Sequence, residues 1–127
     1  MALEIVIQND STGIKGAVTV KLTGSLDTAT APELERKLTP ILASPIKDLV
    51  FDLADLKFIS SAGLRVFANA RRAVQVRGGQ ASFIRMQPQI LEVFAIIQSL
   101  PGVAVFASEE EFDQYLAVRQ QAHESNA

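Results

Sequence analysis

The sequence predicts an α/β domain, with a small, mixed, mostly parallel β-sheet flanked by about four α-helices. Two observations lead to this expectation. Short β-branched or alternating apolar runs, typical of strands, recur along the chain. Segments with apolar residues at helical spacing lie between them and carry helix start and stop signals. A chain of 127 residues fits one domain, and we expect residues 1–119 to form it and 120–127 to be a polar, frayed tail.

The first two strands are expected to form an antiparallel hairpin. Leu3–Gln8 is a β-branched run that stops at a cluster of turn residues. Ala17–Thr23 alternates between apolar and polar residues, as a half-buried strand does, and we expect it to end at Gly24.

A helix and a central strand follow. The helix is predicted over about Ala31–Leu42, with Thr30 and Glu33 as a capping box. Asp48–Leu53 contains a nearly continuous apolar run, which indicates a strand covered on both faces, and Ala54–Ser61 is expected to be a loop.

The second half alternates helices with short strands. We predict a helix over about Ala62–Val76, a strand at Ala81–Arg85, a helix over Gln87–Ser99 and a strand at Val103–Phe106, before a fourth helix capped by Ser108. Strand–helix–strand crossovers imply parallel pairing. Six apolar residues are expected in the core of a domain that folds as a monomer: Leu22, Val50, Phe51, Phe67, Ile84 and Phe94.

Composition excludes several classes of function. There is no cysteine and one histidine, His123, which excludes disulfides, thiol catalysis and cysteine- or histidine-rich metal sites. The formal net charge of −2 does not indicate a nucleic-acid partner. No apolar run reaches the roughly 18 residues of a membrane span, and the N-terminus lacks the basic segment of a signal peptide. We expect a cytoplasmic protein that contacts neither nucleic acid nor membrane.

No catalytic constellation is visible in the sequence. A serine nucleophile would need a base, and the single histidine lies in the expected tail. There is no glycine-rich phosphate loop. We therefore expect no enzymatic activity, no catalytic residues and no cofactor.

The segment Phe58–Arg65 carries the candidate chemistry. Ser60 and Ser61 lie at the junction of the expected loop and helix, where one of them can serve as an N-cap. The same place also suits a phosphoryl group, because a helix N-terminus offers free N–H groups and a positive dipole. Gly63 costs helix propensity in the first turn, which suggests a close approach by another group.

At these residues the sequence resembles the STAS domain family, in its stand-alone form as a bacterial anti-sigma factor antagonist. The resemblance covers about Ile5 to Leu116 and depends on three stretches: Val18–Asp27, Thr30–Leu34 and Phe58–Arg65. The last of these resembles the phosphorylation loop of the family and is the most specific.

The resemblance implies a binding protein that is switched by phosphorylation in the regulation of transcription. Its partner would be an anti-sigma factor that is also a serine kinase of the histidine-kinase-like ATPase type, and a metal-dependent serine phosphatase would reverse the modification. By position the phospho-acceptor is Ser61, with Ser60 as the alternative. Many members have aspartate at the position of Ser60 and a hydroxyl residue at that of Ala62, and this sequence departs from both. The residues expected to bind the partner are Asp27, Thr28, Ser60, Ser61, Ala62, Gly63 and Arg65.

Other interpretations stay open at this point. Asp27 can simply organise a turn, and Arg65 can lie on a solvated helix face. A STAS domain can be a non-phosphorylated scaffold in a transport or sensory assembly. Asp52 and Asp55 suggest a receiver-like signalling domain, but the lysine that such a domain needs after its last strand is missing. A small α/β enzyme is the remaining alternative.

Overall fold

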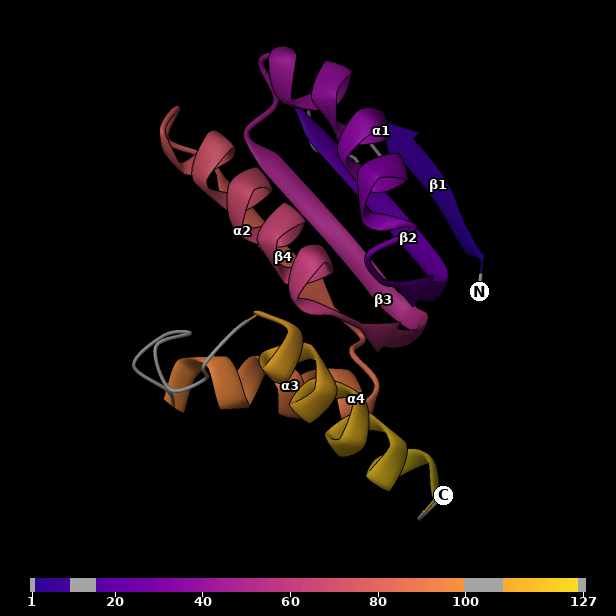
Figure 1. Cartoon of the computed structure of the whole chain (residues 1–127). Helices are drawn as coiled ribbons and strands as arrows, with labels where there is room; N and C mark the ends of the chain where they lie inside the picture. Colours follow the sequence, from indigo (N-terminus) through magenta and orange to yellow (C-terminus); the bar gives the residue numbers. More distant parts are fainter. Residues whose placement is uncertain (1, 10–15, 100–108, 126–127) are drawn as a thin grey trace.

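A computed structural model describes residues 2–9, 16–99 and 109–125 (Figure 1). The elements are β1 (Leu3–Asn9), β2 (Ala17–Leu26), α1 (Ala31–Ala43), β3 (Asp48–Ile59), α2 (Ser61–Gln75), β4 (Gln80–Ile84), α3 (Pro88–Ser99) and α4 (Glu109–Ser125). The sheet has the order β1-β2-β3-β4; β1 is antiparallel to β2, and the other pairs are parallel. The predicted fold class is confirmed. The predicted strand Val103–Phe106 and the cap at Ser108 lie outside the described residues.

The helices are distributed unevenly around the sheet. Helices α1 and α2 lie side by side on one face, and α3 and α4 contact each other near the end where β3 leads into α2 (Figure 1). The prediction that Asp48–Leu53 is covered on both faces is wrong. Val50 is half-buried and Ile84 is 41% exposed, because these side chains lie on the face opposite α1 and α2. These two residues are therefore not in the core.

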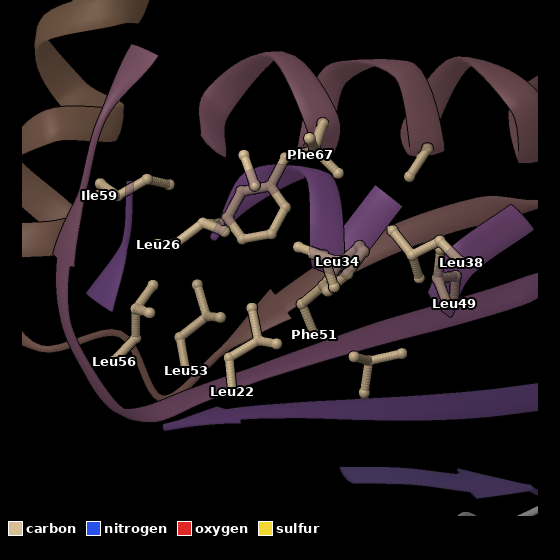
Figure 2. Packing of buried hydrophobic residues seen from close by; sticks show 14 of the residues in the cluster. Leu22, Leu26, Leu34, Leu38, Leu49, Phe51, Leu53, Leu56, Ile59 and Phe67 are labelled. Carbon is tan, nitrogen blue, oxygen red and sulfur yellow. The ribbon is translucent and has the colours of Figure 1, made fainter. Parts of the chain in front are cut away.

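Most of the core lies between the sheet and helices α1 and α2 (Figure 2), and buried residues of α3 and α4 extend it. Of the predicted core residues, Leu22, Phe51 and Phe67 are buried, and Phe94 is half-buried against the same cluster. The ring of Phe51 lies 4.8 Å from that of Phe67 and 5.2 Å from that of Phe83, measured between centroids. Aromatic residues of β3, α2 and β4 thus form one packed group.

Two predicted strand ends are wrong, because each strand continues beyond its predicted last residue. Gly24 does not end β2; it has φ +108° and lies at a register shift, so the strand bends there and continues to Leu26. Strand β3 also continues, through the predicted loop, to Ile59. Its polar residues Asp55 and Lys57 are exposed while Leu56 is fully buried, which is the alternation of a strand with one covered face.

The C-terminal helix extends into the segment that we expected to be a frayed tail. Helix α4 continues to Ser125, and Gln120 is only 3% exposed. The Gln120 side chain accepts a hydrogen bond from the Ile59 N–H (2.8 Å) and donates to the carbonyl oxygens of Ile59 (2.8 Å) and Leu116 (3.1 Å). This amide pairs with the end of β3 as a neighbouring strand would, and so fixes α4 beside the start of α2.

Candidate functional site

The candidate site lies where β3 ends and α2 begins. Ser60 follows the buried Ile59 and keeps an extended backbone (φ −105°, ψ 176°) as the N-cap residue of α2. The Ser60 N–H donates to the carbonyl oxygen of Leu26 (2.9 Å), and the Leu64 N–H donates to the Ser60 carbonyl oxygen (3.0 Å). The first turn of α2 therefore leaves the sheet at a fixed position.

Asp113 of α4 caps α2. The backbone N–H of Ser61 donates to Asp113 Oδ1 (2.7 Å), and the Ser61 hydroxyl donates to Asp113 Oδ2 (2.9 Å). A carboxylate is favoured here for two reasons. It accepts a hydrogen bond from an N–H that has no partner within the helix, and its negative charge lies at the positive end of the α2 helix dipole. The expectation of a serine side chain as N-cap is wrong, since the Ser60 side chain makes no capping hydrogen bond.

The two candidate acceptor serines are both buried but differ in their partners. Ser61 is 8% exposed and its hydroxyl is held by Asp113. Ser60 is 5% exposed, and its Oγ has no hydrogen-bond partner among the described residues. A buried hydroxyl without a partner costs free energy, so Ser60 is a local weak point of the junction.

Gly63 allows α2 to pack closely on the strands. A Cβ atom at this position would lie 2.6 Å from Leu26 Cγ and 3.0 Å from Ile59 Cγ1. The close approach suggested by the sequence is present, and the approaching groups are side chains of β2 and β3. Gly63 is buried, so it contributes to the site by letting the first turn of α2 pack against Leu26 and Ile59.

Asp27 organises the turn between β2 and α1. Its Oδ1 accepts hydrogen bonds from the N–H groups of Ala29 and Thr30, both at 3.0 Å, and from the Thr30 hydroxyl at 3.1 Å. The predicted capping box of Thr30 and Glu33 is wrong, because the Thr30 hydroxyl shares its single proton between Asp27 Oδ1 and the Ser25 carbonyl oxygen (2.9 Å) and makes no cap to α1. The turn presents Thr28 as an exposed residue.

A hollow of about 670 Å³ opens next to Ser61, between the turn after β2 and the helices α2 and α4. It is lined by Thr28, Phe58, Ala62, Arg65, Glu110, Asp113, Gln114 and Ala117. The structure thus brings together Thr28, Ala62 and Arg65 among the residues predicted to bind a partner. Arg65 is exposed on α2, and the hollow carries both charge and apolar surface.

The acidic pair that suggested a receiver-like domain has another role. Asp52 lies on the face of the sheet opposite α1 and α2, where it accepts hydrogen bonds from the Arg85 guanidinium. The Asp55 carboxylate lies 3.5 Å from the Lys21 ammonium. The hydrogen bond from Arg85 lowers the pKa of Asp52 below its ordinary value, even though burial acts in the opposite direction. These carboxylates are structural ion-pair partners.

Within residues 2–9, 16–99 and 109–125, acidic and histidine side chains form no group of three that could hold a metal ion. None of the helices in this part of the chain has the length and apolar character needed to cross a membrane.

Sequence reasoning missed Asp113 and Gln120. Both lie on α4, and their partners Ser61 and Ile59 precede them by 52 and 61 residues. A single polar residue on an amphipathic helix gives no local signal of such a contact, which depends on how α4 packs.

The comparisons with known proteins agree with this geometry. The family model described as "STAS domain" matches residues 8–112. The anti-sigma-B factor antagonist of Bacillus subtilis is 32% identical over 79 residues, which cover 62% of this chain and 72% of that protein.

Two solved structures share the fold. The anti-sigma factor antagonist SpoIIAA in its unphosphorylated form matches with a TM-score of 0.60 at 20% identity, covering 87% of this chain and 93% of that one. The Bacillus cell fate determinant SpoIIAA in the phosphorylated form matches with a TM-score of 0.60 at 16% identity, covering 73% and 82%. The sheet order, the capped start of α2 and the family match lead to one conclusion: this chain belongs to the STAS domain family.

Proposed function

We propose that this chain is an anti-sigma factor antagonist, a cytoplasmic binding protein without enzymatic activity that captures an anti-sigma factor when unmodified and releases it when Ser61 is phosphorylated. The observation that carries the proposal is the Ser61 hydroxyl at the N-terminus of α2, beside a hollow suited to a partner. Support comes from the curated relative named for antagonism of an anti-sigma factor and from a structural neighbour known in a phosphorylated form.

The partner surface in this proposal surrounds that hollow. It consists of the turn with Asp27 and Thr28 and of the first turn of α2, with Ala62 and Arg65 at the surface. Ser60 and Gly63 are buried and act by shaping the backbone. Ser61 is favoured as the acceptor over Ser60 because Ser61 contacts a residue that lines the hollow.

Charge explains why phosphorylation would end binding. A phosphoserine carries about −1.5 to −2 charges at pH 7. A tight interface would desolvate that charge at a cost of several kcal/mol when no partner cation is present. At 1.4 kcal/mol per tenfold, the affinity falls by roughly two orders of magnitude or more. In this proposal the anti-sigma factor is itself the serine kinase, of the histidine-kinase-like ATPase type, and a metal-dependent serine phosphatase restores binding.

The test is a phosphorylation assay with site mapping. The chain is incubated with ATP and candidate histidine-kinase-like serine kinases from the same genome, and intact mass and peptide mapping follow. We expect a single phosphate at Ser61, retained in Ser60→Ala and absent from Ser61→Ala. Phosphate on Ser61→Ala but not on Ser60→Ala would move the site by one residue. No phosphate with any kinase that binds the chain would instead favour the non-phosphorylated scaffold.

A further inference from the structure

The carboxylate that contacts Ser61 also lines the hollow. Asp113 comes from α4, 52 residues after Ser61, and its two oxygens accept the Ser61 backbone N–H and hydroxyl. The contact thus joins the first turn of α2 to the second turn of α4, two helices that the chain does not connect directly. The inference below depends on the proposed function, since it concerns phosphorylation of this hydroxyl.

Phosphorylation would remove this contact in two ways. Phosphoryl transfer from ATP forms the bond between Ser61 Oγ and the γ-phosphorus, breaks the bond from that phosphorus to the oxygen that leaves on ADP, and releases the hydroxyl proton to solvent. The proton that Oδ2 of Asp113 accepts is then gone. The product also places a phosphate dianion against a carboxylate, and the two anions compete for the same backbone N–H at the start of α2.

We propose that Asp113 is the positioning residue of the acceptor serine: it orients the Ser61 hydroxyl in the unmodified protein, and its charge opposes the phosphorylated form, so that phosphorylation releases the Asp113 end of α4 from α2. Linkage makes this coupling reciprocal: phosphorylation weakens the contact between Asp113 and Ser61, and breaking that contact favours the phosphorylated form by the same free energy. The sequence-based view that the helix dipole simply accommodates the phosphate is thereby changed, because a carboxylate already occupies that place.

The release is local. Leu116 buries its side chain in the core, and Gln120 bonds to the end of β3. These contacts keep the rest of α4 in place while its first turns loosen. The loosened part contains Phe112, whose burial in the core limits how far it moves. The other charged side chains lining the hollow are Arg65 of α2 and Glu110 of α4. Arg65 attracts the new phosphate, whereas Glu110 adds to the repulsion from the same hollow.

A test without the kinase separates this inference from the proposed function. Phosphoserine is placed at position 61 during synthesis by genetic-code expansion, in the parent, in Asp113→Asn and in the matched control Glu110→Gln. Asparagine keeps an oxygen that can accept one of the two hydrogen bonds but removes the charge. Glu110→Gln removes the same charge from the same hollow.

The first measurement is a ³¹P NMR titration of the phosphoserine. A neighbouring negative charge raises the second pKa of a phosphate, so we expect that pKa to be higher in the parent than in Asp113→Asn by about half a unit or more. Glu110→Gln should change it much less. Equal values in the parent and Asp113→Asn would overturn the proposal.

The second measurement is amide hydrogen exchange of α4, in proteins with serine or phosphoserine at position 61. In the parent, phosphorylation should accelerate exchange in the first turns of α4 by about tenfold or more, and leave residues near Gln120 unchanged. In Asp113→Asn the two forms should differ far less. Exchange in the parent that is unaffected by the phosphate would contradict the release. If the coupling is present but the phosphoprotein still binds the anti-sigma factor, the proposed function fails and the inference about Asp113 stands.

Discussion

Replacing Gln120 by alanine should destabilise the domain far more than replacing its neighbour Gln121. Gln120 is 3% exposed and makes three hydrogen bonds, two of them with the backbone of the fully buried Ile59. Alanine would leave a buried N–H and a buried carbonyl oxygen without partners, at about 1–3 kcal/mol each. The side-chain entropy that Gln120 loses on folding offsets part of this, by up to about 2 kcal/mol. The expected net loss is about 2–4 kcal/mol.

The assay is urea denaturation at 25 °C, followed by circular dichroism, for the parent, Gln120→Ala and Gln121→Ala. Gln121 is exposed on the same helix, so Gln121→Ala changes the helix propensity and the side-chain volume by the same amounts as Gln120→Ala does. We expect Gln121→Ala to stay within about 0.5 kcal/mol of the parent. If both variants lose the same small free energy of unfolding, the amide of Gln120 does not anchor α4.

Three further predictions concern the scaffold around the site. Phe51→Ala should lower the free energy of unfolding by about 3–5 kcal/mol in urea titrations, because it removes a fully buried ring that packs on Phe67 and Phe83, whereas replacing the 41% exposed Ile84 by alanine should cost much less. Gly63→Val should lower Tm by several degrees, because its side chain would meet the buried ends of β2 and β3; an unchanged melting curve would contradict the close packing. The lowered pKa of Asp52 means that its pairing with Arg85 stabilises the fold above the ordinary pKa and that this contribution fades as pH falls through the lowered value. The stability gap between the parent and Asp52→Asn should therefore be larger at pH 7 than at pH 2–3, and a gap that does not change with pH would argue against the pairing.

Local patterns predicted most of the fold because the strands and helices that build it have clear periodicity. The alternation of Ala17–Thr23 and the apolar stripe around Phe67 each predicted an element that the structure contains. Errors arose where a local rule met a tertiary contact. Gly24 resembles a strand terminator but serves as a bend within β2, and the pairing with β3 resumes after a register shift between Gly24 and Ser25.

The candidate site was predictable only in part. Ser61 and Gly63 carried local signals, namely a hydroxyl at a helix start and a costly glycine in the first turn. Asp113 carried none, since a carboxylate on the exposed-looking side of a helix is common and its partner is set by the packing of α4. For the same reason Gln120 resembled part of a polar tail, although its amide completes the hydrogen bonding of β3.

The proposal that phosphate at Ser61 ends partner binding is tested by a binding titration of the unmodified and phosphorylated chain against its anti-sigma factor. The phosphoprotein with phosphate at Ser61, the unmodified parent and Ser61→Ala are titrated against the same anti-sigma factor by calorimetry. We expect the parent and Ser61→Ala to bind with similar affinity and the phosphoprotein to bind at least about 100-fold more weakly. A phosphoprotein that binds as tightly as the parent would show that phosphate at Ser61 does not release the anti-sigma factor.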